Sequence, residues 1–281
     1  MSEPDDESAL AERGARLRFT VLGCGSSGGV PRIGSEGPNW GACDPENPRN
    51  RRRRCALLVE RITADGRTTV LVDAGPDCRE QLIMAGRGLL DAVVLTHDHA
   101  DHCHGLDDLR MIVFNRRSRL PAYMDALTER TMRARFGYAF EAPEGSSYPP
   151  ILDLLPIDGP FEVPGPGGPV PFVPFAVPHG SVTALGFRIG PLVYLPDISE
   201  MTDEAWAVTE GAEVWLLDTL RYTRHPSHAN LERALDWLTR AAPSAAYLTN
   251  LHVDLDYATL DAETPPHVHP AHDGLVLDYA A

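Results

Sequence analysis

The stretch Thr96-His97-Asp98-His99-Ala100-Asp101-His102 places three imidazoles and two carboxylates within six positions, directly after an apolar run at 91–96. On a helix the three histidines would point in different directions, whereas an irregular loop at the end of a strand can turn them towards one or two shared points. Neutral imidazole and carboxylate are the ligands that hold divalent ions such as zinc, manganese or iron. The stretch therefore predicts a metal site at the end of a buried strand, in preference to a polar surface loop.

Strand-like and helix-like stretches alternate along the rest of the chain. Apolar runs predict strands at 17–22, 55–60, 68–72, 91–96, 170–177, 184–189, 192–196, 213–217 and 245–249. Apolar residues at helical spacing predict helices at 105–113, 125–136, 201–208 and 229–241. Because no internal repeat interrupts this mixture, we expect residues 15–281 to form one α/β domain, preceded by a frayed N-terminus at 1–14.

Composition and charge exclude several classes of protein. With 43% hydrophobic and 23% charged residues, the chain has the composition of a globular protein rather than a disordered one. Its formal net charge of -15 argues against binding a large nucleic acid, because an acidic surface repels the polyanion. The acidic N-terminus is unlike a signal peptide and no segment is long enough to span a membrane, so we expect no membrane partner and a cytoplasmic location.

Two loops near the N-terminus carry residues that binding sites often use. The first predicted strand runs into Gly23-Cys24-Gly25-Ser26-Ser27-Gly28-Gly29, which lacks the lysine of a phosphate-binding P-loop and is interpreted as a turn near a site. Four consecutive arginines, Arg51–Arg54, could gather phosphates, although a short charge run is more typical of a solvated turn. The five cysteines form no Cys-x-x-Cys pair, so we expect reduced thiols.

The Thr-His-x-His-x-Asp-His motif after a strand resembles the signature of the metallo-β-lactamase superfamily. This resemblance implies three more ligands downstream, which are a histidine at a later strand end, an aspartate shared by two ions, and a last histidine near the C-terminus. His179, Asp197 and His252 stand in that order, each beside a strand-like run. The resemblance covers the chain from about residue 17 to 278 and implies the family's four-layered αββα sandwich.

Carried over residue by residue, the resemblance implies two divalent transition-metal ions, with zinc, manganese or iron as candidates. The first ion would take His97, His99 and His179, the second Asp101, His102 and His252, and Asp197 would be shared between them. Two cations about 3.5–4 Å apart can hold a bridging water and lower its pKa towards roughly 7, which makes a hydroxide nucleophile and gives the shared Asp197 a catalytic role. Asp73, in an Asp-x-Gly turn like that of the family, would orient the ligands by hydrogen bonding, with Asp98 beside them.

The chain also resembles the cyclic phosphodiesterase branch of this superfamily, whose best-known member opens phosphoribosyl cyclic phosphate. The similar segments are 23–31, the arginine-rich stretch before Cys55, 105–110, and the segment around His228. In that branch a histidine before a late helix contacts the substrate phosphate or protonates the leaving oxygen, and His228 matches it, with His225 as a weaker candidate. Where relatives hold a structural zinc this chain has only Cys43, with Leu255 at the later position, so we expect no third ion.

These observations predict a dinuclear metal-dependent hydrolase that cleaves a small anionic phosphodiester, such as a cyclic phosphate or a nucleotide. Hydrolysis of a thioester, lactone or β-lactam at the same metal centre is the leading alternative, since fold alone does not set the substrate. A metal-bearing binding protein without activity is the non-enzymatic alternative. The sequence leaves open the physiological substrate, the native metal and the oligomeric state, with a homodimer as one option.

Overall fold

Strands with alternating apolar residues pair into two large sheets in the computed structural model, which describes residues 14–281. The first has the order β16-β1-β4-β5-β6-β7-β8, and the second β15-β14-β13-β12-β11-β10-β9. The first sheet comprises β1 (Arg16–Gly23), β4 (Ala56–Thr63), β5 (Gly66–Val72), β6 (Ala92–Val94), β7 (Leu120–Met124), β8 (Leu152–Pro156) and β16 (Val276–Ala280). The second comprises β9 (Phe161–Val163), β10 (Val170–His179), β11 (Val182–Ile189), β12 (Leu192–Leu195), β13 (Val214–Asp218), β14 (Ala245–Thr249) and β15 (Val268–Pro270).

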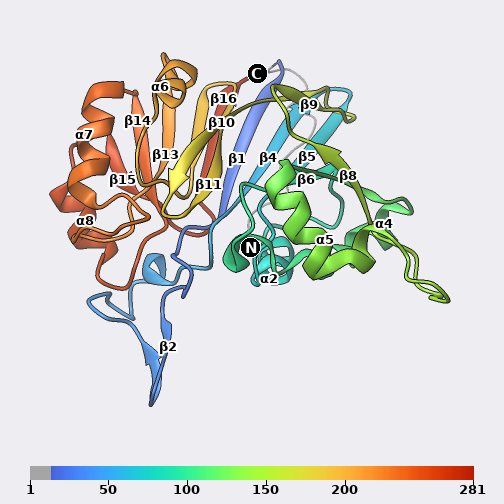
Figure 1. Cartoon of the computed structure of the whole chain (residues 1–281). Helices are drawn as coiled ribbons and strands as arrows, with labels where there is room; N and C mark the ends of the chain where they lie inside the picture. The colour runs from blue at the N-terminus through green and yellow to red at the C-terminus, as the bar shows by residue number, and fades with distance from the viewer. Residues whose placement is uncertain (1–13) are drawn as a thin grey trace.

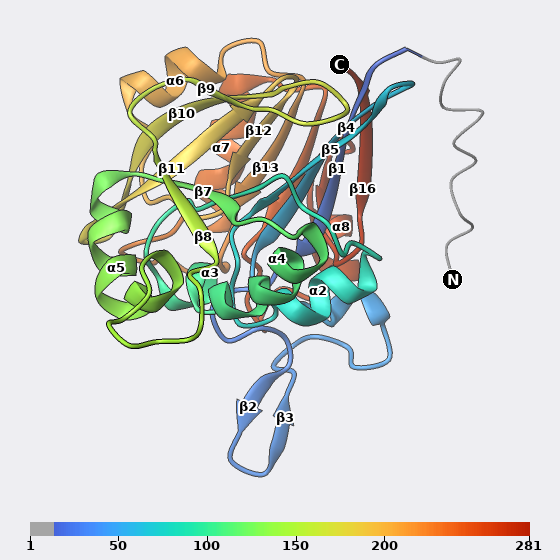
Figure 2. The same cartoon turned by 90° about the vertical axis from the view of Figure 1, so that its right-hand side faces the viewer.

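The two sheets lie face to face and helices cover their outer faces, as Figures 1 and 2 show. Buried side chains from both sheets, such as Phe19 and Phe187, form the central core. The first sheet is covered by α2 (Cys78–Met84), α4 (Arg110–Arg116) and α5 (Ala126–Phe140), and the second by α6 (Asp203–Thr209), α7 (Leu231–Ala241) and α8 (Tyr257–Glu263). The expected αββα sandwich is therefore confirmed.

The predicted strands and helices are all present, with ends shifted by a few residues. The helix expected at 105–113 is divided into a 3-10 turn, η2 (Leu106–Leu109), and α4. Besides the one-turn α3 (Ala100–Cys103), two helices, α2 and α8, were not predicted. Each has only seven residues, and α2 leaves Ile83 and Met84 exposed, so neither stretch shows a clear apolar periodicity.

The carboxyl ends of parallel strands bring polar residues to one edge of the sandwich. β5, β6 and β7 run parallel in the first sheet, as do β12, β13 and β14 in the second. A polar residue ends or closely follows most of these strands: Asp73 after β5, Thr96 after β6, Asp197 after β12, Asp218 at the end of β13 and Asn250 after β14. Ligand sites of α/β sheets commonly lie outside such strand ends.

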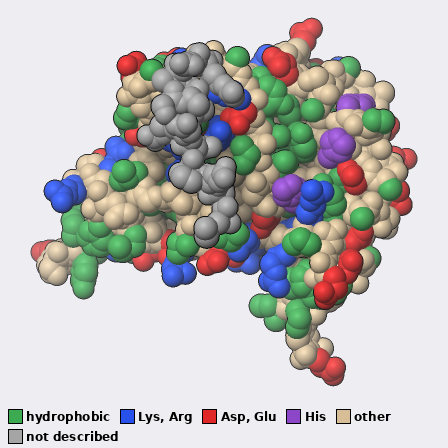
Figure 3. Space-filling model, turned by 180° about the vertical axis from the view of Figure 1, so that it is seen from behind, with side chains coloured by type: hydrophobic (Ala, Val, Ile, Leu, Met, Phe, Trp, Pro, Cys, Tyr) green, Lys and Arg blue, Asp and Glu red, His purple; other side chains and the backbone are tan. Residues whose placement is uncertain are grey.

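A two-stranded hairpin projects from the body of the molecule as an arm (Figures 1 to 3). It consists of β2 (Arg32–Gly34) and β3 (Gly37–Asn39), and Ile33 on it is fully exposed. Residues 1–13, most of the N-terminal stretch expected to be frayed, lie outside the described residues. Among the helices of residues 14–281, none is both long and apolar enough to cross a membrane.

Candidate metal centre

The turn after β5 shapes the histidine loop after β6. Asp73 has a positive φ of 66° and accepts hydrogen bonds from the Thr96 backbone N–H at 2.9 Å and the Thr96 hydroxyl at 3.0 Å. The His102 ring donates from Nδ1 to Asp73 Oδ2 at 2.7 Å. A Cβ on Gly75 would clash with the Asp101 carbonyl oxygen, so only glycine lets the two backbone segments approach this closely. The Asp-x-Gly turn thus orients the loop, as expected.

The histidine stretch is irregular only in its first half. His97 and Asp98 lie in loop, His99 is the N-cap of a one-turn helix, α3 (Ala100–Cys103), and Asp101 and His102 lie within that helix. The expectation of an irregular loop throughout is therefore wrong for the second half. His99 has an extended backbone, so the chain changes direction just before α3. The side chains of Asp101 and His102 on this single turn therefore lie beside the cluster formed by the loop histidines.

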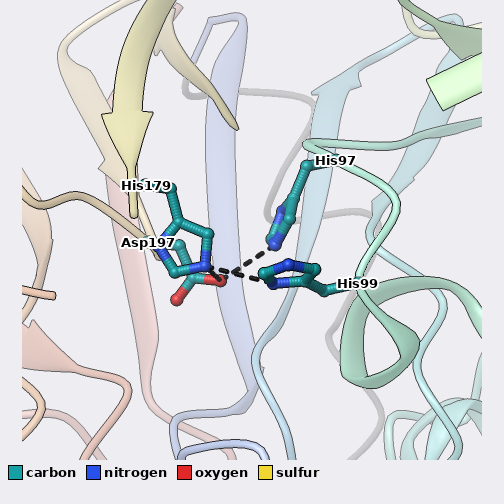
Figure 4. Close-up of side chains that lie close together, drawn as sticks. All are labelled: His97, His99, His179 and Asp197. Atoms are coloured by element: carbon teal, nitrogen blue, oxygen red, sulfur yellow. Dashed lines mark hydrogen bonds and ion pairs between the residues drawn. The ribbon is translucent and has the colours of Figure 1, made fainter. Parts of the chain in front are cut away.

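Four side chains from three segments converge on one point, as Figure 4 shows. His97 and His99 come from the loop after β6, His179 from the end of β10, and Asp197 from the turn after β12. One ligand atom of each lies within 4.8 Å of those of the others. Asp197 Oδ2 lies 3.2 Å from His97 Nε2 and 3.7 Å from His179 Nε2, which in turn lies 3.1 Å from His99 Nδ1.

The second predicted set of ligands adjoins the first through His102. Its Nε2 lies 2.9 Å from Asp197 Oδ2 and 3.5 Å from Asp101 Oδ2, so Asp197 contacts ligands of both predicted ions. His252 lines the same pocket, but its Nδ1 bonds Asp254 at 2.6 Å and it is not in the converging group of donors. The assignment of His252 to a second ion stays a prediction.

These residues fit divalent metal ions. The Nε2 atoms of His97 and His102 are buried and lie 3.2 and 2.9 Å from Asp197 Oδ2, but neither makes a hydrogen bond of good geometry with Asp197 or with any other described residue. Unpartnered buried nitrogens are costly unless something else binds them. A cluster of imidazole nitrogens and carboxylate oxygens is the donor set of zinc, manganese or iron.

The charges around the cluster agree with this assignment. Burial lowers the pKa of His179 to about 4, and burial together with His97 lowers the pKa of His99, so both rings are neutral at pH 7, the form that binds metals. Burial would lower the pKa of His102 too, but the neighbouring carboxylates raise it well above its usual value. Negative charge thus accumulates where the second ion is predicted, and a cation there would balance it.

His228 approaches the cluster from the loop before α7. Its Nδ1 lies 2.9 Å from Asp218 Oδ2 and 3.4 Å from Asp197 Oδ1, while the Asn250 amide donates to both aspartates, at 3.0 and 2.7 Å. Burial would lower the pKa of His228, but the Asp218 carboxylate raises it to about 9, and burial raises the pKa of Asp218 itself to about 6. The two groups therefore form an ion pair at neutral pH beside the predicted metal ligands.

A polar cavity of about 350 Å³ opens over the cluster. It is lined by Ser27, Arg32, His99, Asp101, His179, Asp197, Leu220, Arg221, His225, Ser227, His228, Asn250 and His252. A larger cavity of about 520 Å³ between α2 and α4 is lined by no histidine and by none of the predicted ligands, so we place the site in the smaller one. Both His228 and the weaker candidate His225 thus reach the pocket, and the glycine-rich loop contributes Ser27, as its interpretation as a turn near a site predicts.

The arginine run is a structural element and does not line this cavity. Arg52 is only 2% exposed, whereas Arg53 and Arg54 pair with Asp273 and Asp77. The interpretation as a solvated turn is therefore wrong for Arg52. Its guanidinium donates to the carbonyl oxygens of Leu255 at 2.7 Å and His252 at 3.3 Å. It also lies 3.9 Å from the Cys43 sulfur, so a cationic side chain fills the space where relatives are expected to hold a structural zinc.

Several residues of the site were not predicted from the sequence. Asp218 follows the apolar run at 214–217 in the way Asp197 follows 192–195, and this strand-end position is the signal that could have identified it. Asn250 stands within the segment already singled out for His252. Arg32 and Arg221 belong to no recognisable pattern, because only the folded chain places them at the pocket.

Comparisons with known proteins agree with this geometry. A family model described as a beta-lactamase superfamily domain matches residues 68–250. A Porphyromonas gingivalis protein named octanoyltransferase is 34% identical over 266 residues, covering 92% of this chain and 51% of that protein. The chain therefore spans about half the length of this relative.

Two solved structures share the fold. The crystal structure of a new diphosphatase from the PhnP family is 33% identical, has a TM-score of 0.81, and is matched over 94% of this chain and 97% of that one. The Zn²⁺-bound PqqB from Methylobacterium extorquens is 18% identical with a TM-score of 0.68, over 93% and 100% of the two chains. The matching family model, the similar solved structure and the sandwich together show that this chain belongs to the metallo-β-lactamase superfamily.

Proposed function

We propose that this protein hydrolyses small phosphodiesters, such as a cyclic phosphate or a nucleotide ester, with two divalent metal ions held by its histidine and aspartate cluster. The observation that carries the proposal is the make-up of one cavity. Metal-type donors, an imidazole paired with a carboxylate, and two guanidinium groups all line it. The similarity to a diphosphatase of known structure supports the same class of chemistry.

The predicted ligands divide between the two ions as the resemblance implies. His97, His99 and His179 would hold one ion, Asp101, His102 and His252 the other, and Asp197 both. Bound there, the ions supply Lewis acidity and a water whose pKa is lowered towards roughly 7. Asn250 donates to Asp197 Oδ1, which leaves Oδ2 turned towards His97 and His102.

His228 is placed to move a proton. Nδ1 of its ring donates to Asp218 Oδ2, so Nε2 is the nitrogen that remains for a substrate in the cavity. From that atom the imidazole can donate a proton to the oxygen that leaves phosphorus, or a hydrogen bond to a phosphate oxygen. The Asp218 carboxylate keeps the ring oriented and favours its protonated form.

Acyl substrates are the alternative, because the Porphyromonas gingivalis relative is named for an acyl transfer. That relative is about twice as long as this chain. The pocket does not favour a long acyl group, since Leu220 is the one aliphatic side chain among the described residues that line it. A chain of eight carbons would need an apolar wall to bury its methylene groups.

The test combines metal analysis with a panel of substrates. Protein purified without chelators should cleave bis(p-nitrophenyl) phosphate, lose this activity after dialysis against EDTA, and regain it with zinc or manganese. Turnover of thioesters, lactones or a chromogenic β-lactam in place of every phosphodiester would contradict the proposed substrate class. Bound metal without turnover of any of these substrates would favour a binding protein.

A further inference from the structure

The arm formed by β2 and β3 has no surface of the described chain to cover it. None of residues 32–39 is buried, and the Ile33 side chain is fully exposed. Ile33 lies directly opposite Pro38 in the hairpin, so the two side chains form one apolar face. A hairpin of two three-residue strands is at best marginally stable in water unless such a face packs against another surface. The arm therefore lacks a partner that would stabilise it.

The groove between α2 and α4, with a volume of about 520 Å³, is a surface of matching chemistry. Leu82 and Ile112 line it with buried side chains. Ile83 and Met111 line it too, although they are 59% and 60% exposed. Large apolar side chains that gather at one place on a surface mark a contact with another molecule more often than isolated ones do. The groove can therefore receive an apolar side chain such as Ile33.

The arm and the groove also carry complementary charges. The turn between β2 and β3 presents the exposed carboxylate of Glu36. At the groove, the Arg79 side chain is 69% exposed, and its contact with the adjacent Glu80 is long, at 3.9 Å. A second carboxylate can approach this guanidinium without displacing a strong ion pair. Such complementarity fixes the orientation of a contact whose affinity comes from apolar side chains.

The arm points away from the groove of its own chain but can meet that of a second copy. Figures 1 to 3 show the arm projecting away from the body, and Figure 2 shows α2 and α4 on the side from which it projects. When an arm and its receiving surface lie on one side of a chain, a single two-fold rotation brings the arm of each copy to the groove of the other. The contact is then made twice and the assembly closes as a dimer.

We infer that this protein forms a reciprocal dimer in which the arm of each chain docks in the groove between α2 and α4 of the other. Ile33 of one copy packs between Ile83 and Met111 of its partner. A second copy is the occupant that supplies both halves of this contact from the described residues. The arm begins at Arg32, which lines the polar cavity over the histidine and aspartate cluster, so the partner also holds one wall of that cavity in place.

Sedimentation equilibrium of the full chain tests the inference. At micromolar concentration the wild-type protein should have twice the mass of one chain. Ile33→Asp and Met111→Asp should each raise the dissociation constant by about 100-fold or more, because each places a charge in both copies of an apolar contact. Both side chains are exposed in the single chain, so circular dichroism and metal content should equal those of the wild-type protein.

Leu127→Asp is the matched control. Leu127 lies on α5, is 55% exposed and does not line the groove, so this variant should dimerise as the wild-type protein does. An equal loss of dimer in Leu127→Asp would overturn the inference, because any added charge would then have the same effect.

A disulfide between two variants locates the contact. All five natural cysteines are buried, so introduced surface thiols are the ones that oxidise readily. Mild oxidation of a mixture of Ile33→Cys and Met111→Cys should give a covalent dimer that neither variant gives alone. A monomeric wild-type protein, or a dimer that Ile33→Asp and Met111→Asp leave unchanged, would overturn the inference. So would a wild-type monomer that binds phosphatidylglycerol vesicles through Ile33, since a membrane would then cover the arm.

Discussion

In the first sheet one short stretch after β6 provides four predicted ligands, whereas the second sheet provides its three from the ends of three different segments. His179, Asp197 and His252 are separated by 18 and 55 residues in the chain and meet only because β10, β12 and β14 lie in one sheet. The first group depends on local backbone geometry, and the second depends on the whole sheet being formed.

The two groups are also supported differently. Asp73 bonds both Thr96 and His102, so one carboxylate orients the first group as a unit. In the second group each side chain has its own support: the Ser227 carbonyl for His179, Asn250 for Asp197 and Asp254 for His252. Replacing a supporting residue should therefore disturb several ligands in the first group but only one ligand in the second.

The largest expected effect is that of Asp197→Ala, because this residue joins the two groups. Its Oδ2 is near His97 and His102 of the first group and His179 of the second, so both ions should be lost. Metal affinity should fall by more than the roughly 10–100-fold that loss of a supporting residue costs. Elemental analysis after dialysis gives the metal content, which we expect to fall from about two ions per chain to nearly none.

His252→Ala is the control, with the loss of about one ion expected. Equal losses at both positions in the two variants would contradict the role of Asp197 as the shared ligand.

The next effect in size concerns His228, which is brought to the pocket by the loops of the second sheet alone. His228→Ala should lower kcat on a phosphodiester with an alkoxide leaving group by about 10²-fold, the scale of lost general acid catalysis. Bis(p-nitrophenyl) phosphate should be affected much less, since nitrophenolate needs little protonation. The metal content should equal that of the wild-type protein.

His225→Ala serves as the control for His228, because His225 also lines the pocket but, among residues 14–281, hydrogen-bonds only with Ser227. Equal loss of activity on both leaving groups in His228→Ala would show that His228 positions the phosphate instead of donating a proton.

Asp73→Asn tests whether the first group acts as a unit. Asparagine tolerates the positive φ at this position but cannot accept from both Thr96 and His102 as a carboxylate does. Metal affinity should fall by about 10–100-fold. Asp254 supports His252, so Asp254→Asn should lower the affinity for one ion and leave the affinity for the other unchanged. Titration with a chromogenic chelator measures both affinities. If each variant lowered the affinity for one ion only, the idea that Asp73 orients the first group of ligands as a unit would be wrong.

The smallest expected effect is on stability and concerns Arg52. Arg52→Met leaves the carbonyl oxygens of Leu255 and His252 without this donor, and a buried unpaired group costs about 1–3 kcal/mol. Chemical denaturation should show a loss of free energy of unfolding of about 2 kcal/mol. Arg51→Met, at an exposed position next in the chain, should change it by less than roughly 0.5 kcal/mol. A loss of the same size in both variants would show that Arg52 is not a buried support.

Most strands and the metal-binding stretch could be predicted from the sequence, because both depend on local patterns. Alternating apolar residues specify a strand wherever they pair, and the crowding of histidine and aspartate at 97–102 has few structural explanations. The short helices α2 and α8 could not be predicted, since seven residues show too few turns for a periodic pattern. His179, Asp197 and His252 were predicted only through resemblance to a family, because nothing in their local sequence connects them.

The sequence alone determined that this protein has an α/β core and a cluster of metal-type donors, since those properties follow from residue types at short spacing. Only the tertiary structure decided which polar residues share the pocket. Arg52 and Arg32 show the difference, because the local sequence around each of them is that of an ordinary loop. One is buried against backbone carbonyl oxygens and the other lies over Gly28 at the pocket. Arg52 is paired with Leu255, which is 203 residues away in the chain, and Arg32 shares its pocket with residues as distant as His252, so no local pattern carries that information.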